Sequence, residues 1–312
     1  MGVEIPSDPA PNGYVPNPHQ EQIDAALAFL RAEKESTDGW QDIDTKEGII
    51  MEKKFTSGDN SAIPTVRGRG VVKSLTASAL LSAILQPSAR PLWDARYVSG
   101  DLLERYERRT YKFYNVQKGV RFLVSERDIV GVQTVVFAAG ENPAGGFEVI
   151  QTSVKGDPDN NGRVRATLTC AGWSVTPRGD DLEVSYVAKI NPNGSIPSAV
   201  VAQIVQDIPM AVVNIANFIR SHGVPPYIAS EVLVSQLRTE ILRIGDKTHV
   251  IKLIAGDKDE EITVVVDPKV FGGKWKVEAA GQGVSAEKKD DGNATVKVSA
   301  GAGRYEVTIS AA

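Results

Sequence analysis

The residue types that most often perform catalysis are few in this chain and lie far apart. There are three histidines, His19, His222 and His249, and a single cysteine, Cys170. They do not have the spacing of a metal site, nor do they suggest a Ser-His-Asp or Cys-His arrangement. There is also no P-loop and no GxGxxG turn that opens a helix. The sequence therefore predicts no catalytic residue, no metal ligand and no cofactor, and it favours a protein that is not an enzyme.

The remaining polar candidates are binding groups rather than reactive ones. Arg127 and Asp128 are adjacent in a predicted strand and could orient a ligand hydroxyl. The favoured interpretation is simpler, namely an ion pair between them that fixes the end of the strand. The basic run Arg67–Arg69 is interpreted as a solvated loop rather than a headgroup site. Cys170 lies in a predicted strand, where a buried thiol is unreactive.

The stretch 191–223 carries the clearest helical pattern in the chain. Its apolar residues recur at helical spacing and fill about half of a helical wheel. Asn-Gly in the preceding turn, Ser195 as N-cap and Gly223 as stop mark its limits. Pro209 falls inside the helix and is expected to kink it. Pattern alone favours a helix packed on a sheet, and the alternative is a lid over an apolar cavity.

Upstream of this helix the sequence alternates between short helices and many strands. Helices are predicted over 20–34 and 74–85, and a long series of strands over 93–189. Strands joined by short turns indicate an antiparallel meander. The predicted class is α+β, with a curved antiparallel sheet wrapped around the long C-terminal helix.

Composition and pattern divide the chain into four parts. Residues 1–18 carry five prolines and are interpreted as a disordered tail. The main domain covers 19–227, and 228–245 is predicted as a helical connector. Alternating apolar residues between glycine-rich turns over 246–312 predict a small all-β sandwich of the immunoglobulin-like kind, with five or six strands.

Bulk properties narrow the class of protein. The 312 residues are 42% hydrophobic and 24% charged, with a net charge of −4. That composition is typical of a globular protein and gives no overall reason to bind nucleic acid. The chain contains no apolar run long enough to span a membrane, and its N-terminus has no signal-peptide pattern. With one cysteine, it is expected to be cytoplasmic.

The region from about residue 20 to 227 resembles a START domain, the steroidogenic-acute-regulatory-related lipid-transfer fold. The resemblance is carried by four segments in the family's order: Arg90–Asp94 (RPLWD), Arg127–Val130 (RDIV), Gly172–Pro177 (GWSVTP) followed by Glu183–Val187, and Asn191–Pro197 leading into the long helix with its mid-helix Pro209. The segment 246–312 shows no such resemblance.

The resemblance implies a helix-grip fold with a closed apolar tunnel that holds one lipid, with sterol as the favoured ligand. Some sterol-binding relatives have an arginine six residues after the first motif arginine, where this chain has Gln133. A neutral amide can hydrogen-bond a sterol hydroxyl but pairs poorly with a phosphate. The ligand-binding residues implied in this way are Arg127, Gln133, Trp173, Tyr186, Val205, Ile208, Val212 and Ile215.

The resemblance also implies a gate, because a lipid cannot enter a closed tunnel unless part of the wall opens. It would consist of the long helix and of a loop at about 154–163, and its residues are Val154, Gly156, Asp157, Gly162 and Pro209. The loop is polar and acidic, whereas membrane-docking relatives have apolar tips there. Contact with a membrane is therefore expected to be transient.

Two other functions stay open at this point. Helix-grip relatives include cyclases and hydrolases that act on apolar, polyketide-like substrates. Alternatively, the segment 246–312 binds a protein partner, and the START-like domain senses a lipid for this adaptor.

Overall fold

A computed structural model of the chain describes residues 14–312, except 59–60, 121–122, 141, 157 and 231–232. The described residues form two compact units, the first of Val15–Ala77 and Pro91–Ala216, and the second of Tyr14, Ser78–Arg90 and Asn217–Ala312. Residues 1–13 of the predicted tail lie outside the description. Tyr14, however, is fixed, because its hydroxyl accepts a hydrogen bond from the Leu237 amide at 2.9 Å.

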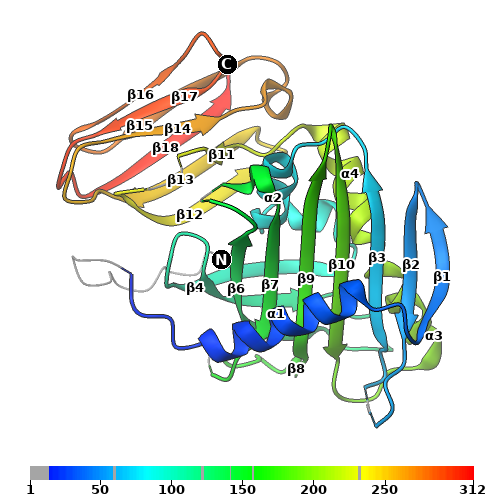
Figure 1. Ribbon diagram of the computed structural model, residues 1–312. Coiled ribbons are helices and arrows are strands. Elements are labelled where there is room, and N and C mark those ends of the chain that lie inside the picture. The colour runs from blue at the N-terminus through cyan, green and yellow to red at the C-terminus, as the bar shows by residue number, and fades with distance from the viewer. Residues whose placement is uncertain (1–13, 59–60, 121–122, 141, 157, 231–232) are drawn as a thin grey trace. The chain divides into compact units, whose positions relative to one another are not determined.

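The first unit is built on one large antiparallel sheet, as predicted (Figure 1). Its described strands form a 10-stranded sheet in the order β1-β2-β3-β10-β9-β7-β6-β5-β4, with the short β8 parallel to β6. The strands are β1 (Trp40–Lys46), β2 (Ile49–Lys54), β3 (Thr65–Val72), β4 (Tyr97–Arg105), β5 (Tyr111–Gln117), β6 (Arg127–Phe137), β7 (Phe147–Ser153), β8 (Val164–Arg165), β9 (Thr167–Arg178) and β10 (Asp181–Asn191). Short 3-10 turns lie at η1 (Arg90–Leu92) and η2 (Pro143–Gly145).

One face of this sheet, called here the outer face, is covered by helix α1 (Gln20–Glu35). The apolar stripe of α1 repeats at helical spacing and packs on side chains from four strands and the turn after β4. The buried cluster consists of Ile23, Ala26, Leu27 and Leu30 from α1, with Tyr106, Val132, Ile150, Cys170 and Val187. A helix fixed in this way anchors the centre of the sheet.

The opposite face, called here the inner face, carries the candidate site. Residues directly opposed in an antiparallel ladder point to the same side of the sheet. Gly68 opposes Tyr186, which opposes Trp173, which opposes Val149. A methyl group added to Gly68 would lie 2.5 Å from the Pro209 carbonyl oxygen. The inner face is therefore the one that the break in the long helix approaches.

The long helix is divided at Pro209 into α3 (Ser198–Asp207) and α4 (Ala211–His222), as the proline inside the predicted helix indicated. The two parts are bent by 50°. The helix begins at Ser198 with Pro197 as its N-cap residue, so the predicted cap at Ser195 is wrong. Among the described residues no single helix is long and apolar enough to cross a membrane, and only the bent pair passes that test jointly.

The basic run in β3 is not a solvated loop. Arg67 is 2% exposed and points to the outer face, where its Nη1 donates to the Glu33 carbonyl oxygen at 2.6 Å and the Ser36 carbonyl oxygen at 3.0 Å. Its Nε donates to Glu52 at 2.9 Å. Arg67 therefore caps the C-terminal end of α1 and ties β2 and β3 to it. The sequence pattern missed this because a buried arginine is recognised by its partners, which come from other elements.

The second unit contains α2 (Ala77–Leu85), whose first residue belongs to the first unit, and two antiparallel sheets. The described strands form the orders β11-β14-β17-β16 and β12-β13-β18-β15, each 4-stranded. Their bounds are β11 (Tyr227–Ile228), β12 (Gln236–Arg243), β13 (Thr248–Ile254), β14 (Glu260–Val265), β15 (Trp275–Ala280), β16 (Val284–Lys288), β17 (Ala294–Val298) and β18 (Arg304–Ala311), with a 3-10 turn η3 (Pro268–Phe271) after β14. Alternating residues are buried in β14 of one sheet and in β18 of the other, as expected of the predicted sandwich.

The helical connector predicted over 228–245 is wrong, because its described residues contain no helix and Gln236–Arg243 form strand β12. In β12 the buried residues are Leu237 and Leu242. Their spacing would put them on opposite faces of a regular strand. The register shift between Leu237 and Thr239 brings both to one face. Because of the bulge, the buried residues of this strand are spaced unlike those of a regular strand, so the sequence was mistaken for a helix.

His249 on β13 gives the second unit a predictable acid sensitivity. It is 0% exposed, and burial lowers the pKa of its imidazole to about 3. In the unfolded chain the imidazole binds a proton near pH 6.5, whereas in the folded chain it does so only near pH 3. The contribution of neutral His249 to the free energy of unfolding is therefore fully present above pH 6.5 and decreases as the pH falls toward 3. We expect a loss of about 2 kcal/mol between pH 7 and pH 5 from this residue. Denaturant unfolding at both pH values should show that loss in the wild type, and His249→Leu should lack that part of it.

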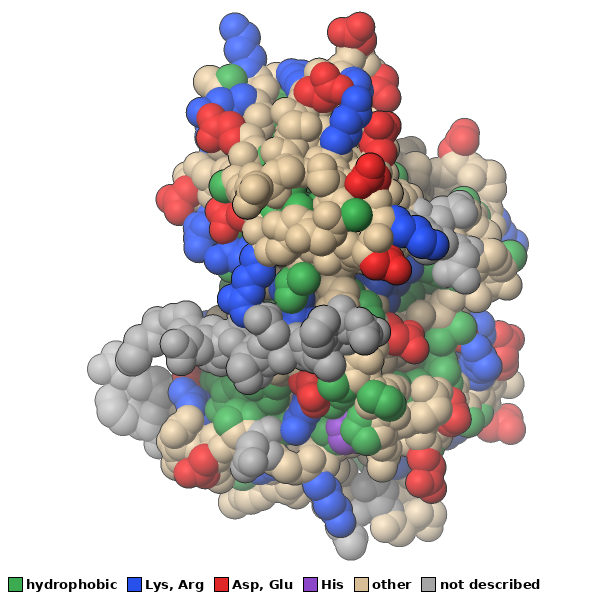
Figure 2. Space-filling model, turned by 90° about the vertical axis from the view of Figure 1, so that its left-hand side faces the viewer, with side chains coloured by type: hydrophobic (Ala, Val, Ile, Leu, Met, Phe, Trp, Pro, Cys, Tyr) green, Lys and Arg blue, Asp and Glu red, His purple; other side chains and the backbone are tan. Residues whose placement is uncertain are grey.

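One face of the molecule shows how its surface charge is distributed. In Figure 2, Lys and Arg side chains are interspersed with Asp and Glu, and hydrophobic side chains form scattered patches. Among the residues drawn in colour, this face therefore shows no extended patch of one sign.

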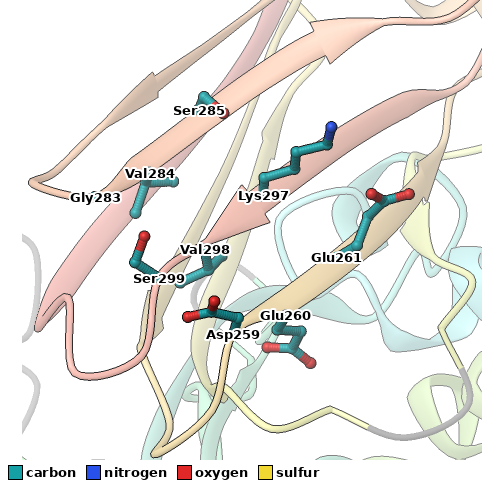
Figure 3. A pocket seen from close by; sticks show the side chains of 9 residues that line it. All are labelled: Asp259, Glu260, Glu261, Gly283, Val284, Ser285, Lys297, Val298 and Ser299. Atoms are coloured by element: carbon teal, nitrogen blue, oxygen red, sulfur yellow. The ribbon is translucent and has the colours of Figure 1, made fainter.

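A groove of about 710 Å³ lies over β14, β17 and β16 of the second unit (Figure 3). Two of its three acidic residues already accept hydrogen bonds from the backbone. Asp259 accepts a hydrogen bond from the Ala300 amide at 2.8 Å, and Glu260 accepts from the Val234 and Ser235 amides at 2.7 and 2.8 Å. These carboxylates hold loops in place, so the groove is not our candidate site.

Candidate functional site

The inner face carries an aromatic cluster at its centre. Trp173 and Tyr186 stack with ring centroids 4.3 Å apart, and Trp93 meets Trp173 edge-on at 6.2 Å. Trp93, Trp173 and Tyr186 are at most 7% exposed. Trp173 and Tyr186 come from neighbouring strands and are directly opposed in the ladder. The cluster makes a rigid, mainly apolar surface, with Tyr186 adding one hydroxyl.

A neutral polar group lies on the same face, two strands away from Trp173. Gln133 is 1% exposed, and its Nε2 donates to the Tyr111 hydroxyl at 2.6 Å. Its Oε1 accepts from Gln151 Nε2 at the same distance. Tyr111, Gln133 and Gln151 are opposed across β5, β6 and β7. The resemblance pointed to Gln133, whereas its two partners could be found only from the strand register.

The predicted residues of the long helix are located on both sides of its break. Val205 is 7% exposed, Val212 and Ile215 are 0% exposed, and Ile208 is half-buried beside Pro209. The close approach of Pro209 to Gly68 sets this helix against the inner face. The apolar face of α3 and the start of α4 thus belongs to the interior of the first unit.

Arg127 is at the edge of the site, where it holds the turn that leads into α3. Its guanidinium donates to the carbonyl oxygens of Pro192 at 3.2 Å and Asn193 at 3.1 Å, and to the Ser125 carbonyl oxygen at 2.7 Å. Burial, together with the nearby Arg96 cation, lowers the pKa of Arg127. The expected Arg127–Asp128 ion pair is wrong, because adjacent strand residues point to opposite faces.

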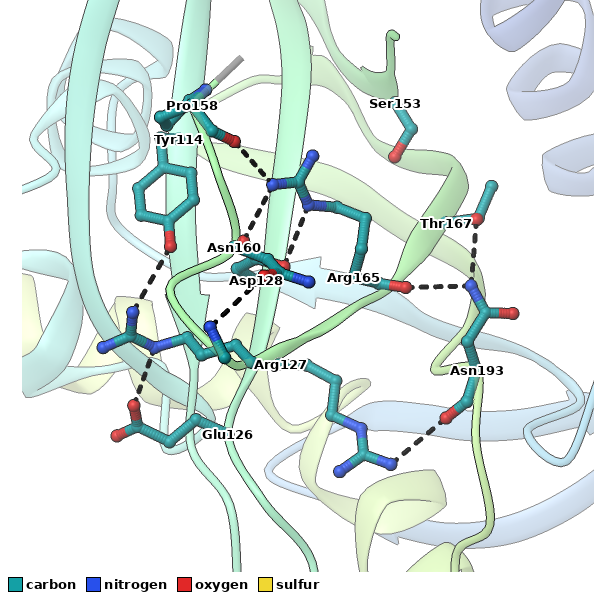
Figure 4. Close-up of polar contacts among 12 residues, drawn as sticks. Tyr114, Glu126, Arg127, Asp128, Ser153, Pro158, Asn160, Arg165, Thr167 and Asn193 are labelled. Carbon is teal, nitrogen blue, oxygen red and sulfur yellow. Dashed lines mark hydrogen bonds and ion pairs between the residues drawn. The ribbon is translucent and has the colours of Figure 1, made fainter. Parts of the chain in front are cut away.

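Asp128 instead clamps the loop at 154–163 (Figure 4). Its carboxylate is 0% exposed and receives two hydrogen bonds from Arg165, at 2.9 and 3.0 Å. The same guanidinium donates to the Pro158 carbonyl oxygen at 2.8 Å. The Arg165 carbonyl oxygen accepts from Asn193 Nδ2 at 2.9 Å. One network therefore holds both the loop and the turn before α3 to the start of β6.

The predicted gate residues of the loop have separate positions. Val154 packs on the outer-face clusters, and its amide donates to the Val130 carbonyl oxygen at 3.1 Å. Gly156 and Gly162 have positive φ angles of 122° and 79°, which allow the loop to turn twice. Asp157 lies outside the described residues. A role for these residues in gating stays a prediction.

The clamp yields a test of the loop's attachment. Asp128→Asn removes the charge but preserves the shape, so we expect a stability loss of about 1–3 kcal/mol. We also expect faster amide exchange in the described part of 154–163, measured by hydrogen–deuterium exchange. Glu126→Gln is the matched control, because the Glu126–Arg163 pair at 2.9 Å is 43% and 30% exposed and should contribute less than about 1 kcal/mol. Equal effects of the two variants would contradict the clamp.

The cysteine and two of the histidines have structural surroundings within their own units. Cys170 lies in the cluster under α1, and burial raises the pKa of its thiol to about 12. His249 is in the core of the second unit, and His222 stacks on Phe218 at the end of α4. Within the described part of the chain, no group of three or more His, Cys, Asp or Glu side chains could hold a metal ion.

The family is decided by comparison with known proteins. The model of the START domain matches residues 20–221, well over half of the chain. The chain belongs to the START domain family. The match ends at the last turn of α4, so most of the second unit lies outside the START domain. No curated protein matches the chain.

Two human proteins of known structure agree with this assignment at the level of the fold. Human StAR-related lipid transfer protein 5 superposes with a TM-score of 0.56 at 16% identity, over 64% of this chain and 95% of that one. Human STARD10 gives 0.50 at 17% identity, over 71% of this chain and 85% of its own. A STAR-related lipid transfer protein fragment from Xanthomonas axonopodis is 24% identical over 59% of this chain and 99% of its own, with a TM-score of 0.49.

Proposed function

We propose that this START domain binds one hydrophobic ligand, with a sterol favoured, between the inner face and the α3–α4 segment, and carries or senses it without chemical conversion. The aromatic cluster would form part of the wall, and Gln133 would hold the ligand's polar end. Val205, Val212 and Ile215 would contact the apolar part. The single cysteine fits a cytosolic carrier.

The observation that carries the proposal is the state of the Gln133 amide. An amide offers two N–H donors and two lone pairs. In the described residues one donor and one lone pair are used, by Tyr111 and Gln151. One N–H and one lone pair are left, which is the complement of a hydroxyl group. A phosphodiester, the group that links most phospholipid headgroups, has only acceptors at neutral pH and would match the N–H alone, so the amide favours a neutral alcohol.

The affinity would come mainly from the apolar part of the ligand. Each buried CH₂ contributes about 0.8 kcal/mol, so a sterol skeleton supplies most of the binding free energy. One hydrogen bond adds about 0.5–1.5 kcal/mol net and serves chiefly to orient the ligand. Arg127 does not favour the enzyme alternative, because its guanidinium binds backbone oxygens at the entrance to α3.

The test compares a sterol with the same ring system lacking its hydroxyl group. Gln133→Leu should weaken sterol binding by about 3–10-fold, which corresponds to one neutral hydrogen bond. Binding of the deoxygenated ring system should change much less. A titration followed by tryptophan fluorescence, with Trp173 in the proposed wall, measures both affinities. Equal losses for the two ligands, or binding of neither ligand by the wild type, would contradict the proposed function.

A further inference from the structure

The C-terminal end of α4 is enclosed by residues of the second unit. Helix α4 begins in the first unit, and its residues from Asn217 onward belong to the second. The helix stops at Gly223, whose φ of 93° is the left-handed conformation typical of a helix end. The Gly223 amide donates to the Ile219 carbonyl oxygen at 2.9 Å.

Two side chains at η3 secure this helix end. Asp267 accepts a hydrogen bond from the Val224 amide at 2.8 Å through one carboxylate oxygen. Through the other it accepts from the Lys269 amide at 2.9 Å, which makes it the N-cap of η3. The Lys269 ammonium donates to the Arg220 carbonyl oxygen in the last turn of α4. A cation at this position also balances the negative end of the helix dipole.

The backbone around Gly223 packs so closely against η3 that a side chain would not fit there. A methyl group added there would lie 2.8 Å from Asp267 Oδ2 and 3.0 Å from Lys269 Cβ. The chain then enters β11 directly, and Tyr227 and Ile228 pair with Val265 and Val264 of β14. The end of α4 is therefore fixed on both sides by the segment from β14 to η3, whose residues Val270 and Phe271 are buried.

We propose that the β14–η3 segment is a fixed anchor for α4, so that the α3–α4 segment opens at Pro209 and not at its C-terminal end. Pro209 breaks the helical hydrogen bonding, while Gly223 is held by Asp267 and Lys269. The β14–η3 segment then acts on the last turn of α4 within its own unit, and this role requires no partner protein. The proposal rests on the proposed function for its effect on ligand release, but the restricted motion of α4 can be measured without a ligand.

The experiment uses the full chain and three variants. Asp267→Ala removes the acceptor for the Val224 amide, and Lys269→Met removes the ammonium group but keeps the aliphatic stem. Lys276→Met is the control, because its salt bridge to Glu278 lies on the exposed surface of β15. Hydrogen–deuterium exchange of α4 amides is compared with that of β13 and β18. Release of a bound fluorescent sterol is measured in parallel.

We expect Asp267→Ala to raise the amide exchange rate over residues 217–224 by about tenfold or more. Lys269→Met should cause a smaller rise, and the control should leave the rate unchanged. Exchange in β13 and β18 should stay as in the wild type, and sterol release should become faster in the same order. Unchanged α4 exchange in a folded Asp267→Ala would overturn the proposal. The proposal would also be overturned by an equal rise in the amide exchange of β13 and β18. Faster exchange in α4 without faster release of the sterol would overturn it as well. If the wild type binds no sterol, the proposed function fails. The amide exchange of α4 then tests by itself whether the β14–η3 segment anchors this helix.

Discussion

Gly68→Ala is expected to lower the melting temperature and to speed the release of a bound ligand. The added Cβ would lie 2.5 Å from the Pro209 carbonyl oxygen and 3.2 Å from its carbonyl carbon. Both are backbone atoms, so no side-chain rotation relieves the clash and the helix break must move away from the sheet. Overpacking of this kind costs about 1–3 kcal/mol, or about 2–12 °C in melting temperature.

The matched control for Gly68 is Gly245→Ala. Nothing lies within 4 Å of a methyl group at that position, and its φ does not require glycine. Thermal unfolding and ligand release should therefore stay close to the wild type in the control. A Gly68→Ala protein with wild-type stability and release would show that the helix break does not depend on contact with β3.

Arg67→Met is expected to cause the largest loss of stability. Arg67 precedes Gly68 on β3 and points to the opposite face of the sheet. It is almost fully buried between Glu52 and the end of α1. Its guanidinium also lies 4.1 Å from the centroid of the Trp40 ring. Removing one partner of a buried ion pair costs about 3–5 kcal/mol, which corresponds to about 6–20 °C in melting temperature. Thermal unfolding measures this shift.

Arg69→Met separates the buried pair from the exposed one. Arg69 bonds the same Glu52 carboxylate at 2.7 Å, but its side chain is 44% exposed. The loss should be about 1 kcal/mol or less. Burial acts to raise the pKa of Glu52, and hydrogen bonds from Arg69 and Arg67 outweigh it and keep that pKa below its usual value. If both variants lost equal stability, the capping of α1 by Arg67 would not be the main contribution.

The sequence was sufficient to predict the features that depend on local residue pattern and on the order of segments along the chain. The succession of helices and short-turn strands predicted the antiparallel sheet, and Pro209 predicted the break in the long helix. The four segments ending at Asn191–Pro197 pointed to the START family, which the family model confirms. These features are visible in sequence because each depends on neighbouring residues or on chain order.

What the sequence missed depends on pairing between distant strands. Tyr111 and Gln151 became partners of Gln133 only once the register across β5, β6 and β7 was known. Asp128 was assigned to its sequence neighbour, whereas its partner is Arg165, which the parallel pairing of β8 with β6 brings opposite it. The strand β12 was missed for a local reason, because the bulge between Leu237 and Thr239 changes which of its residues share a face.

Native mass spectrometry of the delipidated full chain, after incubation with cholesterol-containing vesicles and re-isolation, tests the central claim most directly. The account predicts one added sterol mass per chain, and a smaller bound fraction for Gln133→Leu under the same conditions. A chain that shows only its bare mass after exposure to sterols and to acyl lipids would contradict it.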